Sequence, residues 1–146
     1  MDIEQKKYVT KIHEKELLLY KLENQITYIL DDFWLENRKE KLSTLREQCK
    51  GLRRAIKPYY DKLYKSLNEE LLSKNELMIL HAVCNLSDEI EKADGRINEL
   101  YVDLHQGLVT KEKTFYNILK NRTLQSQKAR KHVLDLLGCL EVKING

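Results

Sequence analysis

The stretch LMILHAVCNLSDEIEKADGRINELYVDL, residues 77–104, decides the fold class. Apolar residues return in it every three or four positions, which is the spacing of one side of an amphipathic α-helix. The stripe consists of Val83, Leu86, Ile90, Ala93, Ile97, Leu100 and Leu104. It keeps its register past Ser87, so we expect no break there and predict one continuous helix.

Two similar stripes precede this one. The first contains Ile12, Leu19, Ile26 and Phe33, with Leu22 and Ile29 between them. The second contains Leu42, Leu45, Cys49, Leu52, Ile56, Tyr59 and Leu63. Such spacing is typical of helices that pack side by side in a coiled coil or a slender bundle. We therefore predict an all-α protein, an elongated antiparallel bundle of three long helices, or of four if one of them is divided.

Proline and glycine predict where the helices end. Pro58 lacks a backbone N–H and disfavours helical geometry at the preceding residue, so we place a corner at residues 55–57. Because the apolar stripe continues through Pro58, a kinked helix is the alternative. Gly107 predicts a second corner, with Thr110 as the cap of the last helix, and Ser73 could cap a further one. The predicted helical legs are 3–56, 58–106 and 110–140.

These legs differ in length. At 1.5 Å per residue, the first two would span about 75 Å and the last about 45 Å. Part of the longer pair would then project or pack against another chain, so self-association and a monomeric state both stay open. With 146 residues, the chain fits one domain, 1–146.

Composition narrows the class of protein. The sequence has no run of about 18 apolar residues that could span a membrane, and its N-terminus is too polar for a signal peptide. The three cysteines, Cys49, Cys84 and Cys139, are odd in number and widely spaced, which favours a reducing compartment. We expect an intracellular protein, cytoplasmic or, in a eukaryote, nuclear.

No pattern of residues indicates catalysis. His81 and Cys84 could form half of a metal site, but no second pair has matching spacing. Cys84 and Cys139 are predicted to be small core residues. Phosphate-binding glycine loops and nucleophile motifs do not occur. We therefore expect no enzyme, no metal and no cofactor.

Positive charge is concentrated in two windows. Residues 38–57 contain eight basic and two acidic residues, and residues 111–131 contain seven basic and one acidic, so each window carries +6. If both windows share a face, they could bind phosphate groups or an acidic partner. Alternatively, they complement acidic stretches of neighbouring helices and fix helix pairing.

The aromatic residues form two groups. Trp34 lies one position off the first stripe, so we expect it to be partly exposed, and tryptophan is common at binding hot spots. Tyr59, Tyr60 and Tyr64 are predicted to fill the corner at Pro58.

The function that fits these features is a non-enzymatic scaffold or adaptor with a protein partner, or one subunit of a larger assembly. The alternative is binding of nucleic acid or another anionic surface through windows 38–57 and 111–131. The candidate partner-binding residues are Trp34, Arg38, Lys39, Arg46, Arg53, Arg54, Lys120, Arg122, Lys128, Arg130 and Lys131.

Overall fold

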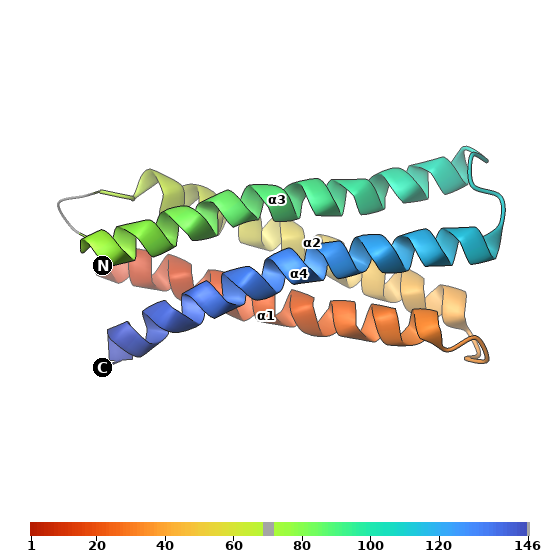
Figure 1. Cartoon of the computed structure of the whole chain (residues 1–146), viewed down its shortest axis with the longest axis horizontal. Helices are drawn as coiled ribbons and strands as arrows, with labels where there is room; N and C mark the ends of the chain where they lie inside the picture. The colour runs from red at the N-terminus through yellow and green to blue at the C-terminus, as the bar shows by residue number, and fades with distance from the viewer. Residues whose placement is uncertain (69–71, 146) are drawn as a thin grey trace.

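The computed structural model describes residues 1–68 and 72–145, with side chains through residue 140, and it is all-helical in this part of the chain (Figure 1). Four helices follow one another: α1 (Ile3–Asp31), α2 (Arg38–Lys65), α3 (Lys74–His105) and α4 (Glu112–Asn145). They form an elongated up-and-down bundle, which confirms the predicted fold class.

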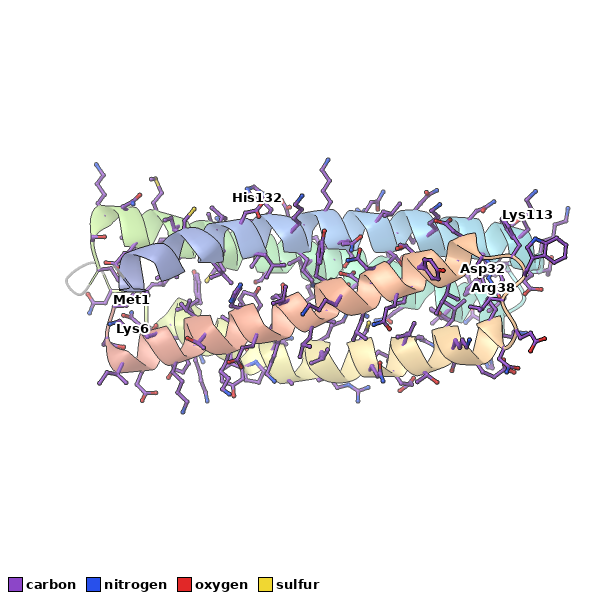
Figure 2. All side chains as sticks on the ribbon, turned by 90° about the horizontal axis from the view of Figure 1, so that it is seen from below. Met1, Lys6, Asp32, Arg38, Lys113 and His132 are labelled. Atoms are coloured by element: carbon purple, nitrogen blue, oxygen red, sulfur yellow. The ribbon has the colours of Figure 1, made fainter. Side chains whose placement is uncertain are left out.

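Three sides of the bundle are tightly packed and the fourth is not. α1 packs against α2 and α4, and α3 packs against α4, whereas α2 and α3 make few contacts. α2 and α4 are diagonal, and within the described residues their Cα atoms do not come within 8 Å of each other. The loops 32–37 and 106–111 lie at one end, while Met1, the end of α2 and the start of α3 lie at the other (Figures 1 and 2).

Two helix starts are fixed by capping boxes, in which side chains satisfy backbone N–H groups that the helix leaves free. The Gln5 backbone N–H donates to Asp2 Oδ1 at 2.7 Å, and the Glu76 backbone N–H donates to Ser73 Oγ at 3.1 Å. In both boxes, the second side chain accepts a hydrogen bond from the backbone N–H of the cap residue. The predicted cap at Ser73 is confirmed.

The predicted corner at Pro58 is wrong, because α2 runs through this residue. Pro58 faces solvent, so its ring displaces no core side chain. Ile56 and Leu63 stay buried on either side of it, and their burial offsets the hydrogen bond that proline cannot donate. Tyr60 is buried in the core and Tyr64 is exposed, so the tyrosines do not fill a corner.

The chain instead turns within the first two predicted legs. Phe33, predicted in the first stripe, lies exposed in the 32–37 loop, and a second connection follows at 66–73. The corner at Gly107 is confirmed, since its φ of 77° is one that glycine adopts without strain. α4 begins at Glu112, two residues beyond Thr110, so Lys111 rather than Thr110 precedes the helix.

The helices have similar lengths of 29, 28, 32 and 34 residues. The inference of a projecting leg is therefore wrong, and the four helices cover one another along the bundle (Figure 1).

The interior contains two apolar clusters. One gathers around Ile12, Leu63 and Leu137, and the other around Leu19, Leu100 and Leu119. Along every helix, buried or partly buried polar residues lie between the two clusters. The core is therefore divided by a polar layer near the middle of the bundle.

Candidate functional site: a buried charged layer and an aromatic end

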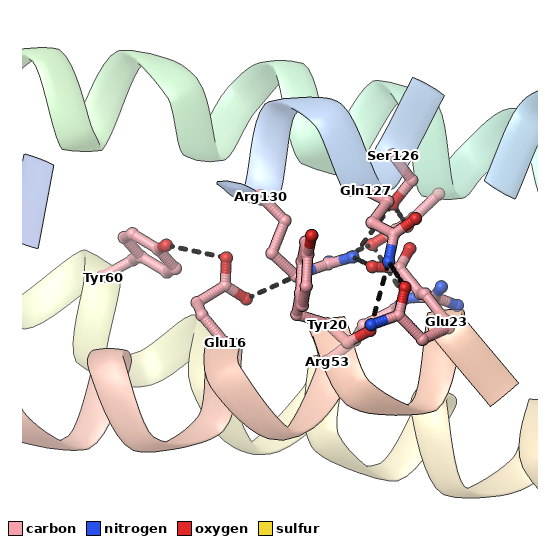
Figure 3. A network of polar contacts seen from close by, with 10 residues as sticks. Glu16, Tyr20, Glu23, Arg53, Tyr60, Ser126, Gln127 and Arg130 are labelled. Carbon is pink, nitrogen blue, oxygen red and sulfur yellow. Dashed lines mark hydrogen bonds and ion pairs between the residues drawn. The ribbon is translucent and has the colours of Figure 1, made fainter. Parts of the chain in front are cut away.

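Arg130 on α4 is at the centre of the polar layer and is fully buried. Its Nη1 lies 2.5 Å from Glu23 Oε1, its Nε 3.3 Å from Glu16 Oε1 and its Nη2 3.4 Å from Asp94 Oδ2 (Figure 3). Nη1 also donates to Ser126 Oγ at 3.0 Å. One guanidinium thus joins carboxylates from α1 and α3.

The remaining helix, α2, contributes Arg53 and Tyr60. Arg53 Nε lies 2.8 Å from Asp94 Oδ2, and the Tyr60 hydroxyl donates to Glu16 Oε2 at 3.2 Å. The Ser126 hydroxyl donates to Asp94 Oδ1 at 2.8 Å. The layer therefore ties all four helices together, with three carboxylates and two guanidiniums in direct contact. We call these five residues the charged layer: Glu16, Glu23, Asp94, Arg53 and Arg130.

Burial controls the protonation of this layer. It raises the pKa of Glu16 and of Glu23, and the attraction of Arg130 opposes that rise only in part. For Arg130, burial favours the neutral form, but Glu23, Glu16 and Asp94 outweigh it and raise the pKa above its usual value. Arg130 is thus a permanent cation, whereas the two glutamates take up protons more readily than exposed ones.

A groove between α2 and α3 leads to this layer. It has a volume of about 400 Å³, and Glu16, Tyr60 and Arg130 contribute to its lining. Lys57 and Glu91 form an ion pair across it at 3.5 Å. The charged groups around the groove are largely paired with one another.

The cysteine and histidine residues that the sequence analysis considered do not come together. Burial raises the pKa of the Cys49 and Cys84 thiols to about 11, so both stay protonated at neutral pH. His81 is exposed while Cys84 is buried, so they do not converge. Within residues 1–68 and 72–145, no three His, Cys, Asp or Glu side chains are grouped to hold a metal ion. Cys139 is exposed, and its prediction as a core residue is wrong.

Six of the predicted partner-binding residues contact the bundle itself. Arg53 and Arg130 belong to the charged layer, and the Arg46 guanidinium lies 3.6 Å from the Tyr101 ring centroid. Lys120 pairs with Asp31 at 2.5 Å, and Arg122 donates to the Arg96 carbonyl at 2.5 Å. The sixth, Arg38, donates to the carbonyls of Ile29 and Leu30. Arg53, Lys120 and Arg130 thus pair with acidic residues of other helices, as the alternative to partner binding predicted. Arg38, Arg46 and Arg122 instead contact backbone carbonyls or an aromatic ring.

Four other predicted residues point to solvent: Lys39, Arg54, Lys128 and Lys131. The first two are on α2 and the last two on α4, and these helices are diagonal. The common basic face that would unite the windows is therefore not formed.

Trp34 lies in the 32–37 loop and is 93% exposed, as its place off the stripe predicted. Phe33 beside it and Leu108, in the other loop at the same bundle end, are each 71% exposed (Figure 1). We call these three residues the aromatic end. Arg38 lies at this end too, beside Asp32 and near Lys113 (Figure 2).

The loop that carries Trp34 is held in place. The Trp34 backbone N–H donates to Asp32 Oδ1 at 3.2 Å, and Asn37 adopts a left-handed conformation. The Arg38 guanidinium lies over Phe33 and Tyr116, at 5.3 and 4.2 Å from the ring centroids. These contacts involve the Trp34 backbone, Phe33 and Arg38, while the Trp34 side chain itself is 93% exposed.

The charged layer was missed in the sequence, although a signal exists. Glu16 and Glu23 alternate with Ile12, Leu19 and Ile26 at spacings of four and three, so they occupy positions on the buried stripe. A carboxylate at such a position requires a buried counter-charge.

No helix in the described part of the chain is both long and apolar enough to cross a membrane. Comparison with known proteins found no matching family model, no matching curated protein and no matching solved structure.

Proposed function

We propose that the protein is a non-enzymatic interaction module, a scaffold, adaptor or subunit of a larger assembly, that binds a protein partner through the aromatic end. The observation that carries this proposal is the exposure of Trp34, 93%, next to Phe33, 71%. Large exposed aromatic groups are costly to hydrate and are concentrated at binding hot spots.

The geometry of the loop supports the proposal. Asp32 accepts a hydrogen bond from the Trp34 backbone, and Arg38 ties the start of α2 to the end of α1, so little backbone entropy would be lost when a partner covers the indole. Lys39 is exposed just beyond the loop and could contribute a polar contact at the rim.

A non-enzymatic role is supported by the chemistry of the interior. The ionisable groups of the charged layer are paired with one another, and the buried thiols are protonated at neutral pH. In this proposal, these groups hold the helices together and do not bind a substrate.

The test compares the wild-type chain with Trp34→Ser and with Met78→Ser. The second variant removes another exposed apolar side chain, which lies on α3 and is 64% exposed. Each is used to capture proteins from an extract of the native host, and each captured protein is then purified and titrated against all three. We expect to find a partner whose affinity for Met78→Ser equals its affinity for wild type. Its affinity for Trp34→Ser should be at least about thirtyfold weaker. A partner that binds all three variants equally would place the interface elsewhere.

The alternative, binding of nucleic acid or another anionic surface, has weaker support because the four exposed residues Lys39, Arg54, Lys128 and Lys131 lie on diagonal helices. A titration of DNA and RNA binding against salt tests it, since phosphate contacts give a steep loss of affinity with salt. A variant with Gln in place of Lys39, Arg54, Lys128 and Lys131 serves as the comparison. Salt-dependent binding by wild type that this variant loses would favour the alternative.

Self-association is a separate proposal. The projecting leg from which it was inferred is not formed in this bundle, so self-association needs its own test. Light scattering on a sizing column distinguishes a monomer of 17.4 kDa from a dimer.

A further inference from the structure

A small cavity of about 20 Å³ lies beside the charged layer, inside the bundle. All four helices contribute to its wall. The polar residues that line it are Glu23, Arg46, Cys49, Arg53 and Thr123, and the apolar or aromatic ones are Ile26, Leu42, Ile97, Tyr101 and Leu119. It is distinct from the open groove between α2 and α3.

Three buried polar atoms of residues lining this cavity have no hydrogen-bond partner: Glu23 Oε2, Arg46 Nε and Arg53 Nε. Arg53 Nε lies 2.8 Å from Asp94 Oδ2, but this is a charge contact whose angle does not make a hydrogen bond. Glu23 is fully buried, and its Oε1 is already paired with Arg130. Three such atoms around one cavity are unusual, because buried polar groups in proteins nearly always find a partner.

We propose that this cavity binds one water molecule, which donates a hydrogen bond to Glu23 Oε2 and accepts from the Nε–H groups of Arg46 and Arg53. Holding a water takes roughly 10–15 Å³ and two to four polar partners, and the site provides both. A cation would be repelled by two guanidiniums and an anion by the carboxylate. A neutral molecule that donates and accepts suits this mixture best.

The water would bring a third cation into the charged layer. In direct contact, the layer has three carboxylates, Glu16, Glu23 and Asp94, and two guanidiniums, Arg53 and Arg130. Arg46 is the third guanidinium, and its contact with Tyr101 keeps it beside the cavity. Linked through water, it would balance the charges of the layer and keep Glu23 ionised.

The groups around Glu23 come from every neighbouring helix. α4 contributes Arg130 and Ser126, and α3 contributes Asp94. α2 contributes Arg46, Arg53 and Cys49, and Glu16 lies on α1 itself. Of the cations, only Arg46 has no carboxylate within ion-pair distance among the described contacts, so its effect on Glu23 depends on the bridging molecule.

A crystal structure of the full chain at high resolution tests the site directly. We expect one peak of water density within hydrogen-bond distance of Glu23 Oε2 and of at least one of the two Nε atoms. An empty cavity, a direct bond between Arg46 and Glu23 that closes it, or an anomalous signal from an ion would overturn the proposal.

Two variants test its consequence for charge. Arg46→Met keeps most of the side chain but cannot donate to the water, whereas Arg54→Met changes an exposed arginine of the same helix and serves as the control. We expect Arg46→Met to lower the folding equilibrium constant about tenfold at pH 7, and much less at pH 4.5, where Glu23 takes up a proton. Arg54→Met should behave like wild type at both pH values.

The outcomes are distinguishable. A loss that is equal at both pH values would come from the lost contact with Tyr101 and would contradict the proposed link to Glu23. Refolding of an unfolded Arg46→Met variant on acidification would support it. The aromatic end is not involved, so this result and the test of the proposed function are independent.

Discussion

At the scale of single residues, Arg130 shows how one side chain can decide the packing of a bundle. It is fully buried on α4 and contacts carboxylates of α1 and α3. A buried ion pair need not be more stable than an apolar pair of the same volume, but a buried charge that loses its partner is strongly unfavourable. Helix arrangements that separate Arg130 from Glu16 and Glu23 are therefore disfavoured, so the layer specifies how the helices align.

Replacing Arg130 tests this role. Arg130→Met leaves two carboxylates buried without their main counter-charge, and we expect the free energy of unfolding at pH 7 to fall by about 3–5 kcal/mol. Urea unfolding followed by circular dichroism measures the change. Lys131→Met, which alters the exposed neighbour, should leave stability within about 0.5 kcal/mol of wild type. If Arg130→Met were as stable as wild type, the layer would not specify the alignment.

For single residues, the sequence predicts whether a side chain is exposed better than it predicts what the side chain contacts. Trp34 was predicted to be partly exposed because it leaves the stripe, and it is exposed. The fate of the basic residues was harder to predict, because a long side chain can reach either inward or outward from a boundary position. Arg130 was predicted as a partner-binding residue, although its place in the 3–4 series Thr123, Ser126, Arg130, Val133 and Leu137 indicates a buried position.

At the scale of elements, the helices were predictable and two of their three connections were not. The apolar spacing continues by coincidence from Ile26 to Phe33, so the stripe extends past the true end of α1. The signals for that turn are weak ones: an aspartate that accepts from the backbone two residues on, and Asn37 in a left-handed conformation. The second connection has a stronger signal, the Ser-x-x-Glu capping box at Ser73. Ser73 was predicted as a possible cap, but the predicted leg 58–106 was not divided there.

Pro58 itself supplies an element-scale prediction. Within α2 it removes the hydrogen bond to the Arg54 carbonyl, and its side chain faces solvent without packing on the core. Pro58→Ala should therefore raise the free energy of unfolding by about 1–3 kcal/mol.

Chemical unfolding measures the gain, and amide exchange reports whether the new N–H is protected by a helical bond. Ser43→Ala, at another exposed position of α2, controls for helix propensity. A loss of stability in Pro58→Ala would mean that the proline shapes α2 for a packing purpose.

At the scale of the whole molecule, three sides of the bundle are closely packed, and the fourth, where the groove between α2 and α3 lies, is bridged by charged side chains. Between α2 and α3, Arg46 lies over Tyr101, Arg53 pairs with Asp94, and Lys57 pairs with Glu91. Along α2, the three cations are seven and four residues apart. Their partners on α3 are seven and three residues apart in the opposite direction along the chain, as expected for two antiparallel helices. These residues of the basic window 38–57 thus contribute to helix pairing. The charge pattern alone could not distinguish this role from the binding of a partner.

The charged layer also determines how the stability of the whole bundle depends on pH. Burial raises the pKa of Glu16 and Glu23 above their values in the unfolded chain, so the folded state binds protons more readily. As pH falls from 7 through the folded pKa, their protonation favours folding, and this gain is complete below the unfolded value of about 4.5. The lowered pKa of Glu76, caused mainly by its hydrogen bond with the Ser73 backbone, acts oppositely at lower pH. Maximum stability is therefore expected in mildly acidic solution.

Glu16→Gln isolates one of these groups. The amide keeps an acceptor for Arg130 Nε and can donate to the Tyr60 oxygen, so the geometry is retained while the titration is lost. We expect wild type to gain melting temperature between pH 7 and pH 5, and Glu16→Gln to gain less while being at least as stable at pH 7. Glu89→Gln, an exposed change on α3, should keep the wild-type profile. A wild-type bundle that lost stability over this range would show that Arg130 attracts the buried carboxylates more strongly than burial penalises their charge, since the folded pKa would then lie below the unfolded one.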